Sequence, residues 1–122
     1  MNHSPIHFEI PADDEGKLAE FYKGLFGWKV EKYPGPMDYW MIETAPQGQG
    51  VNGGLMKRQA PQQQIIVYFQ VESVDDYVKK IKALGGQVVM EKHPVPKMGY
   101  FAIALDPQHN AFAIWEMNPQ AA

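Results

Sequence analysis

The feature of this sequence that most restricts its fold is an internal repeat. When the chain is shifted against itself by 59 positions without gaps, apolar residues of one half meet apolar residues of the other. The matched pairs include Phe8 with Val67, Leu18 with Tyr77 and Val30 with Val89. Two residues of slippage then align residues 37–42 with residues 98–103. Few residues are identical, so the agreement lies in the apolar pattern, which predicts two structural units built on one plan.

Both halves have the same predicted order of elements. Each opens with a short strand of alternating, β-branched and aromatic residues, at 6–10 and 65–71. A helix follows in each, and glycines are expected to end it. The apolar helical stripes are Leu18, Phe21, Tyr22 and Leu25 in the first half, and Val74, Tyr77, Val78, Ile81 and Leu84 in the second.

Three shorter strands are expected after each helix, separated by stretches rich in proline and glycine. Their predicted positions are 29–33, 39–44 and 53–57 in the first half, and 87–92, 100–105 and 111–117 in the second. The glutamine-rich segment 58–64 looks like a linker. We therefore expect one domain, 1–122, made of a βαβββ module over 1–60 and a second over 61–122.

Composition removes several classes of function. The chain has 122 residues, 45% of them hydrophobic, with a net charge of -3 and no cysteine. Thiolate zinc sites, disulfides and a cysteine nucleophile are therefore excluded. No cluster of Lys or Arg predicts binding to nucleic acid, and no segment is long and apolar enough for a membrane helix. Without a recognisable signal peptide, a cytoplasmic protein is expected.

Several stretches together resemble the vicinal oxygen chelate superfamily, which includes glyoxalase I, the bleomycin-resistance proteins and extradiol dioxygenases. They are His7 to Asp14, Ala19 to Trp28, Val67 to Val71, Leu84 to Gly86, Met98 to Ala102 and Asp106 to Gln108. The resemblance implies an α+β fold in which tandem βαβββ modules form a curved, partly open mixed β-sheet with the helices outside. It also implies a homodimer. One departure is the turn after Gln108, where His109-Asn110 replaces the usual glycine; Asn110 could supply the left-handed conformation.

The resemblance also implies where a metal would bind. In metal-dependent members, the first and last strands of each half offer one ligand each. His7 matches the first of these positions, but Ile66, Ala113 and the Gly53-Gly54 region stand at the other three. Since a metal site needs three or four ligands in fixed geometry, no cofactor is expected. His7 is the one candidate for a divalent metal ligand, and Glu9 could join it.

Strand alternation predicts the lining of a small-molecule pocket. The residues expected on its face are His7, Glu9, Ile66, Tyr68, Gln70, Ala113 and Trp115. The opposite face, packed on the helices, should carry Phe8, Ile10, Val67, Phe69, Phe112 and Ile114. Alternatively, Tyr68 and Trp115 fill a closed barrel, and Tyr39, Trp40, Met56 and Tyr100 could add to either arrangement. Glu116, which alternates away from Ala113, is expected in solvent, as are His3, His93 and His109.

Three functions remain open. The first is a glyoxalase- or bleomycin-resistance-like protein that binds a small, planar or partly aromatic molecule without a complete metal site. The second is a metal-dependent lyase, isomerase or dioxygenase that uses His7 and Glu9. The third is a structural or partner-binding module with no ligand.

Overall fold

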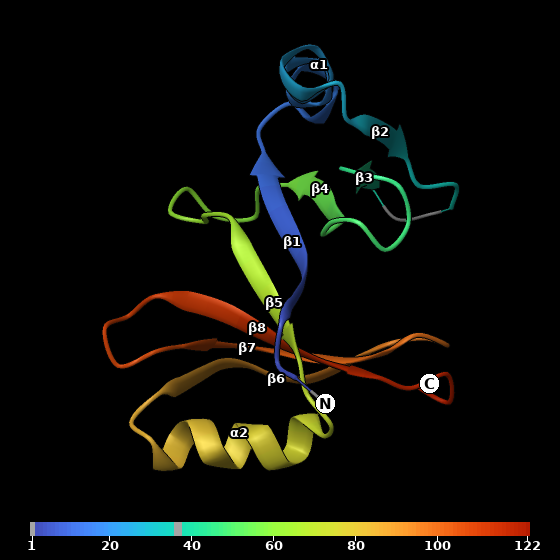
Figure 1. Ribbon diagram of the computed structural model, residues 1–122. Helices are drawn as coiled ribbons and strands as arrows, with labels where there is room; N and C mark the ends of the chain where they lie inside the picture. Colours follow the sequence, from blue (N-terminus) through green and yellow to red (C-terminus); the bar gives the residue numbers. More distant parts are fainter. Residues whose placement is uncertain (1, 36–37) are drawn as a thin grey trace. The chain divides into compact units, whose positions relative to one another are not determined.

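The computed structural model describes residues 2–35 and 38–122. The chain divides into two compact units (Figure 1): an N-terminal unit, His7–Ile66, and a C-terminal unit, Val67–Ala122 with the residues up to Ile6. The N-terminal half contains β1 (Pro5–Ala12), α1 (Glu15–Phe26), β2 (Lys29–Lys32), β3 (Tyr39–Glu43) and β4 (Gly53–Lys57). The C-terminal half contains β5 (Ile66–Gln70), α2 (Val74–Ala83), β6 (Gln87–Val95), β7 (Gly99–Leu105) and β8 (Ala111–Met117). The predicted βαβββ order is confirmed in both halves.

Both units have the same sheet topology. In the N-terminal unit the strand order is β2-β3-β4-β1, and β1 runs parallel to β4 while the other neighbours are antiparallel. In the C-terminal unit the order is β5-β8-β7-β6, and β5 runs parallel to β8. The predicted α+β class with mixed strand pairing is therefore confirmed.

Each helix packs on one face of its own sheet and forms that unit's core. In the N-terminal unit, Ile10, Ala12, Ala19, Val30, Ile42 and Leu55 are buried together, with Phe8 and Trp40 packed against them. In the C-terminal unit the cluster is Val71, Val74, Val78, Ala102 and Ile114, with Tyr100 and Phe112 beside it. Phe8, Ile10, Phe112 and Ile114 thus lie on the helix-facing side, as expected. We call the other side of each sheet its open face.

Local signals in the sequence account for the helix ends. The carboxylate of Asp14 accepts a hydrogen bond from the Lys17 N–H at 3.1 Å, and Gly27 takes a left-handed φ of 70° after α1. At the start of α2, the Ser73 hydroxyl accepts from the Asp76 N–H at 3.2 Å. Glu116, expected in solvent, instead accepts from the Val74 N–H at 2.9 Å. Its strand alternation was correct, but that side of β8 meets the start of α2, where a carboxylate is stabilised.

The strand register corrects the repeat alignment around β3. Tyr39 pairs with Met56, and Phe101 pairs with Trp115, which is the counterpart of Met56 at the 59-residue offset. Tyr39 therefore corresponds to Phe101, 62 residues later, and not to Tyr100. Because a shift of one residue moves a strand's side chains to the opposite face, this difference decides which aromatic residues reach the open face.

A second correction concerns the turn after β7. The residue with a left-handed φ, 67°, is His109 and not Asn110. Asn110 instead donates its backbone N–H to Asp106 Oδ1 at 3.0 Å and its side-chain amide to Asp106 Oδ2 at 3.0 Å. These bonds, led by the backbone N–H of Asn110, lower the pKa of Asp106 below its ordinary value.

Candidate functional site

The open face of the N-terminal unit carries a compact polar cluster. β1 presents His7 and Glu9 there, because they alternate with the core residues Phe8 and Ile10. β3 contributes Tyr39. The side chain of His7 is 29% exposed and that of Glu9 is 17% exposed, so the cluster is half-buried and still reaches solvent.

Hydrogen bonds join these three side chains in a fixed order. The Tyr39 hydroxyl donates to Glu9 Oε2 at 2.9 Å and lies 2.8 Å from His7 Nε2. Since a phenol has one proton to give, and it goes to Glu9, His7 must donate from Nε2 to the Tyr39 oxygen. His7 Nε2 and Glu9 Oε2 are 3.7 Å apart. The arrangement can hold a polar group of a ligand, and it can pass a proton between imidazole and carboxylate through the phenol.

A glycine makes room for the tyrosine. Gly54 on β4 pairs with Glu9 on β1, and the Tyr39 ring lies over it. A Cβ built on Gly54 would lie 1.7 Å from the Tyr39 hydroxyl and 2.1 Å from its Cζ, which is far inside contact distance. Any side chain at residue 54 would therefore exclude Tyr39 from this position. The cluster depends on Gly54 as much as on the three residues that form it.

The donor set does not fit the metal site of metal-dependent relatives. Gly54 belongs to the Gly53-Gly54 region, where the resemblance implies a ligand in metal-dependent members, and Tyr39 fills the space that a side chain at residue 54 would need. Within residues 2–35 and 38–122, no three His, Cys, Asp or Glu side chains are grouped closely enough to hold a metal ion. His7 and Glu9 alone give two ligands, fewer than the three or more that fix a metal.

The open face of the C-terminal unit is aromatic and apolar. Tyr68 pairs with Ala113, and Gln70 pairs with Trp115, so these four residues share one side of the sheet. The Phe101 ring lies 6.2 Å from that of Tyr68 and 5.5 Å from that of His93, centroid to centroid. The Trp115 ring lies over Gly99, where a Cβ would come within 2.7 Å of it.

The seven residues predicted to line one pocket thus belong to different units. His7 and Glu9 lie on the N-terminal unit's open face, Ile66 is the first residue of β5, and Tyr68, Gln70, Ala113 and Trp115 lie on the C-terminal unit's open face. That they form a single pocket stays a prediction. Of the four undecided residues, Tyr39 and Met56 share the open face, while Trp40 and Tyr100 pack on the helix side.

Tyr39 is the site residue whose role the sequence did not establish. The signal was present, since Gly53-Gly54 in a strand indicates a close approach by another group. The repeat alignment, however, paired Tyr39 with Tyr100, which faces α2. The three outlying histidines, His3, His93 and His109, are all exposed, as expected. His3 in addition lies 3.0 Å from the Gln70 carbonyl and 3.1 Å from the Tyr77 hydroxyl.

A second group of ionisable residues lies at the start of α1. Burial of the Glu15 carboxyl, followed by its hydrogen bond with Asp38 and the charge of Asp38, raises its pKa above 4.5. The two carboxyls line a hollow of about 380 Å³ with Lys32, Trp40 and Lys57. This pair is separate from the His7–Tyr39–Glu9 cluster, because the hollow is lined by Trp40, which packs on the helix side of the sheet, whereas His7 and Glu9 lie on the open face.

Comparison with known proteins identifies the family. Residues 4–114 match the sequence model of the Glyoxalase/Bleomycin resistance protein/Dioxygenase superfamily. This chain belongs to that superfamily. The match covers both βαβββ units, so the superfamily assignment rests on nearly the whole chain and not on one motif.

The superfamily relatives include proteins of different activities. The anthracycline biosynthesis protein DnrV of Streptomyces peucetius is 28% identical over 128 aligned residues, which cover 92% of this chain and 46% of DnrV. The chain thus spans about half the length of this curated relative. A superfamily member from Vibrio splendidus has a TM-score of 0.68 at 13% identity, covering 96% of this chain and 100% of that one. Methylmalonyl-CoA epimerase from Mycobacterium tuberculosis has a TM-score of 0.70 at 13% identity, covering 94% and 88%. At such identities these structures show the fold alone.

One further property concerns membranes. In the part of the chain that the structure describes, neither helix has the length and apolar character required to span a bilayer. The two helices have 12 and 10 residues, and about 20 apolar residues are needed.

Proposed function

We propose that this protein binds a small organic molecule through the open face of its N-terminal unit, using the His7–Tyr39–Glu9 cluster in place of a complete metal site. The observation that carries the proposal is the hydrogen-bonded cluster itself, with Tyr39 seated over Gly54. A small number of fixed polar groups on a partly exposed, otherwise apolar surface is typical of ligand sites.

The apolar neighbours of the cluster support this proposal. Met56 pairs with Tyr39 across β3 and β4, and Met41 pairs with Gly54, so both methionines share the open face with the cluster. Methionine side chains are flexible and polarisable, and they adapt to flat or aromatic partners. A planar molecule with one polar edge could place that edge at His7 and its ring against Met41 and Met56.

The relatives suggest which compounds to test first. DnrV is named for anthracycline biosynthesis, so anthracyclines and smaller planar phenols form the first panel. The first experiment is isothermal titration calorimetry of the purified chain against this panel in metal-free buffer. We expect at least one compound to bind and to raise the midpoint of thermal unfolding.

Three variants test whether the cluster holds the ligand. Tyr39→Phe removes the hydroxyl that joins His7 to Glu9, and we expect affinity to fall about tenfold, equivalent to about 1.4 kcal/mol. His7→Ala and Glu9→Gln should weaken binding by a similar factor. His93→Ala is the matched control, because His93 is an exposed histidine next to Phe101 on the C-terminal unit. Equal affinities in all four variants would exclude the cluster as the binding site.

A metal-dependent lyase, isomerase or dioxygenase is the second candidate. It is favoured by one observation, that His7 Nε2 and Glu9 Oε2 lie 3.7 Å apart on the same open face. Elemental analysis after purification without chelator distinguishes the two candidates. Stoichiometric nickel, zinc, iron or manganese that is lost in His7→Ala would support this enzyme and would contradict the metal-free site.

A further inference from the structure

The apolar stripe of α1 forms only part of a core, because several of its large side chains stay in solvent. Phe21 is 58% exposed and Leu25 56%, whereas Leu18 and Tyr22 pack inward. The predicted stripe was therefore correct as a pattern but only partly as a core. Phe26, which is 57% exposed, adds a third large apolar side chain to this outer surface.

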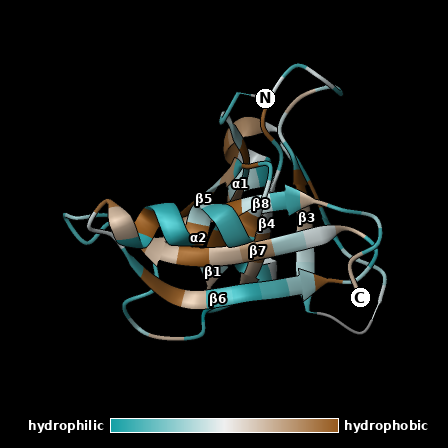
Figure 2. Ribbon diagram, turned by 90° about the horizontal axis from the view of Figure 1, so that it is seen from below, coloured by the Kyte–Doolittle hydropathy of each residue, from teal (hydrophilic) through white to brown (hydrophobic). Residues whose placement is uncertain are grey.

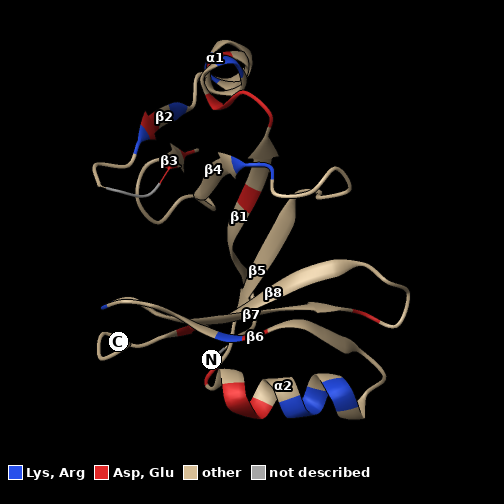
Figure 3. Cartoon of the chain, turned by 180° about the vertical axis from the view of Figure 1, so that it is seen from behind, with Lys and Arg blue, Asp and Glu red and all other residues tan. Residues whose placement is uncertain are grey.

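The plan shared by the two units does not require such a surface. Counting from the two N-caps, Asp14 and Ser73, the place of Phe21 on α1 is taken by Lys80 on α2. Figure 3 shows acidic residues at the start of α2 and basic residues along the rest, and Figure 2 shows the hydrophilic bands of the same helix. The exposed phenylalanine is thus specific to the N-terminal unit.

A hollow of about 540 Å³ lies beside Phe21. The rings of Phe21 and Tyr22 line it from α1 and meet edge to face, with their centroids 5.1 Å apart. Ile65, which is 54% exposed, lines it from the segment before β5. We call this space the α1 hollow. Its volume lies within the range of roughly 300–1,000 Å³ that is usual for sites of small organic molecules.

The α1 hollow is separate from the His7–Tyr39–Glu9 cluster. All of its lining residues belong to the N-terminal unit, and they include Ile10, a core residue on the helix side of β1. His7 and Glu9 alternate with the core residues of β1 and lie on the open face. A ligand in the α1 hollow would therefore not touch the cluster, and a site here is independent of the function proposed above.

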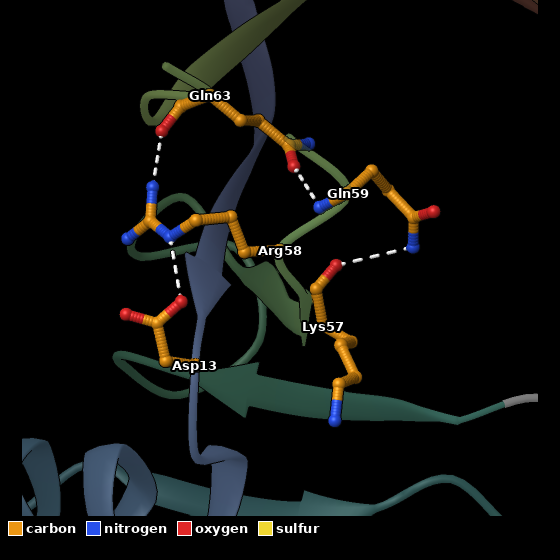
Figure 4. Close-up of polar contacts among 5 residues, drawn as sticks. All are labelled: Asp13, Lys57, Arg58, Gln59 and Gln63. Carbon is orange, nitrogen blue, oxygen red and sulfur yellow. Dashed lines mark hydrogen bonds and ion pairs between the residues drawn. The ribbon is translucent and has the colours of Figure 1, made fainter. Parts of the chain in front are cut away.

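Hydrogen bonds hold one wall of the α1 hollow in place (Figure 4). Arg58, whose side chain is 28% exposed, donates from Nε to Asp13 Oδ1 at 3.0 Å and from Nη1 to the Gln63 carbonyl. The Gln63 side chain accepts from the Gln59 N–H at 2.6 Å. The segment 58–63 is thereby tied to the residue that follows β1. This wall is fixed before a ligand arrives, which lowers the entropic cost of binding.

The charged residues that line the α1 hollow differ in how far their hydrogen bonds are satisfied. The Asp13 carboxylate accepts from Arg58 Nε. The Asp14 carboxylate accepts from the Lys17 N–H at 3.1 Å, at the positive end of α1. Within residues 2–35 and 38–122, however, neither the Lys17 ammonium nor Nη2 of Arg58 has a hydrogen-bond or ion-pair partner. Carboxylates that already have partners, beside cations with N–H groups left to donate, favour an anionic ligand.

We propose that the α1 hollow is a second ligand site, which binds a planar aromatic carboxylate. The ring of the ligand packs against Phe21, Tyr22 and Ile65, because aromatic edges and faces attract each other and the aliphatic side chain adds apolar contact. Its carboxylate accepts from the Lys17 ammonium and from the remaining N–H groups of Arg58. The exposed Phe21 thus has a partner in the bound state, which accounts for a large apolar side chain where α2 has a lysine.

Titration of the isotope-labelled chain with 2-naphthoate, followed by the chemical shifts of the backbone amides, tests the proposal. We expect saturable binding with a dissociation constant of about 1 mM or lower. The largest shifts should come from α1 around Phe21 and from residues 63–65, which line the hollow. Shifts confined to other parts of the chain, or no saturation in the millimolar range, would overturn the proposal.

Two compounds with the same ring test the sign of the head group. The neutral 2-naphthylmethanol should bind about fivefold more weakly than 2-naphthoate, because it loses the charge of the carboxylate. The cationic 2-naphthylmethylamine should bind at least about tenfold more weakly, because Lys17 and Arg58 repel it. If the amine bound as tightly as the acid, Asp13 and Asp14 would dominate the hollow, and the proposal would be wrong.

Two pairs of variants locate the site, and each pair contains its own control. Phe21→Ala should weaken 2-naphthoate binding about tenfold, whereas Phe26→Ala, at an equally exposed phenylalanine of α1 that does not line the hollow, should change it less than about twofold. Lys17→Met should weaken binding about fivefold, whereas Lys23→Met, at a lysine paired with Glu20, should not. All four should unfold at temperatures close to wild type, because these positions are exposed. Equal effects within either pair would contradict the proposal.

Tyr39→Phe distinguishes this site from the open face. It changes the His7–Tyr39–Glu9 cluster and leaves the lining of the α1 hollow intact, so the affinity for 2-naphthoate should stay at the wild-type value. If Tyr39→Phe weakened binding and Phe21→Ala did not, the acid would bind at the open face. The second site would then be refuted, while the function proposed for the cluster would stand.

Discussion

The open faces of the two units show how one plan has been used in two ways. The polar residues of the N-terminal open face have apolar or aromatic counterparts in the C-terminal half. Ile66 corresponds to His7, Tyr68 to Glu9 and Phe101 to Tyr39. Gly54 becomes Ala113, and Met56 becomes Trp115. The N-terminal unit keeps a hydrogen-bonded polar cluster, and the C-terminal unit presents rings.

Under the proposed function, this contrast assigns specificity for the ligand to the N-terminal half. A phenol held between an imidazole and a carboxylate has a fixed orientation, and such groups discriminate between ligands by their hydrogen bonds. Rings such as those of Phe101, Tyr68 and Trp115 add apolar contact area with less direction. The strand order and the strand directions are nevertheless the same in both units, so the difference between the open faces lies in side chains and not in topology.

The two open-face glycines are the strongest test of the comparison. A Cβ on Gly99 would lie 2.1 Å from the Glu116 carbonyl, which is backbone and cannot move away. A Cβ on Gly54 meets first the far end of the Tyr39 side chain, which can swing aside. We expect Gly99→Ala to cost about 3 kcal/mol of unfolding free energy and Gly54→Ala about 1–2 kcal/mol, both measured by urea denaturation.

Double variants make this test sharper. Removing the ring in Tyr39→Ala should abolish most of the cost of a second substitution, Gly54→Ala, because the clashing atoms are gone. Trp115→Ala should not rescue Gly99→Ala, since the Glu116 carbonyl remains in place. If removing the ring restored stability in both units, or in neither, the substitutions at Gly54 and Gly99 would be limited by the same kind of contact, which would contradict the comparison.

The next largest effect on stability is expected at Tyr39 and Tyr100, the two tyrosines that the repeat alignment matched. Tyr39→Phe removes the hydroxyl between His7 and Glu9 and should cost about 1 kcal/mol, since a hydrogen-bonded partner is lost from a half-buried site. Tyr100→Phe keeps the ring that packs beside the α2 core, with the Lys92 ammonium 4.3 Å from its centroid. Its cost should be less than half as large. Equal costs from thermal unfolding would contradict the corrected register.

The sequence predicted the architecture well because that information is local and repeated. Strand alternation, helix caps and punctuating glycines each specify a short segment, and two halves with the same pattern reinforce each other. The sequence also predicts, through the family resemblance, that His7 is the one expected ligand present, with Ile66, Ala113 and the Gly53-Gly54 region at the other positions, and this stays a prediction.

Contacts across strands were harder to predict. The cluster depends on whether Tyr39 points to the open face, and that depends on a register that an error of one residue reverses. The loop between β2 and β3 differs in length from the one between β6 and β7, so no ungapped alignment could fix it. Exposure of Phe21 also could not be read from periodicity, because an apolar helical stripe has the same pattern whether its own sheet or another surface covers it.

The turn before β8, the last strand of the C-terminal unit, provides a test with a smaller expected effect. His109 holds a left-handed φ of 67°, which costs a non-glycine residue more than a glycine. His109→Gly should raise the unfolding free energy by about 0.5 kcal/mol, the relief being partly offset by the greater freedom of glycine in the unfolded chain. Asn110→Gly, measured beside it, should instead lower stability, because the hydrogen bonds from the Asn110 side-chain amide to Asp106 Oδ1 and Oδ2, at 3.3 and 3.0 Å, are lost. If His109→Gly lowered the unfolding free energy and Asn110→Gly raised it, Asn110 and not His109 would be the residue with the left-handed backbone conformation.

The smallest effect compares the acidic first turns of the two helices. Glu15 on α1 faces Asp38, and burial and this like charge raise its pKa, whereas Asp75 on α2 faces Lys92, whose Nζ lies 3.0 Å from Asp75 Oδ2. A raised folded pKa means that Glu15 favours the folded state below its ordinary value of 4.5 and loses that contribution as pH rises through the folded value. The unfolding free energy of Glu15→Gln should therefore improve relative to wild type as the pH goes from about 4 to about 7.

Asp75→Asn should instead lower the unfolding free energy at neutral pH, because it removes the hydrogen bond from Lys92. The hydrogen bond from Lys92 to Asp75 is the main reason that the Lys92 pKa lies above 10.5. That pair stabilises the fold below the ordinary lysine pKa and is lost as pH rises through the raised one. Urea denaturation of both variants and wild type at several pH values measures the two trends together. The contrary result would be an unfolding free energy of Glu15→Gln that falls relative to wild type as the pH rises. Glu15 would then stabilise the start of α1 as a charged carboxylate, and the acidic first turns of the two helices would act alike.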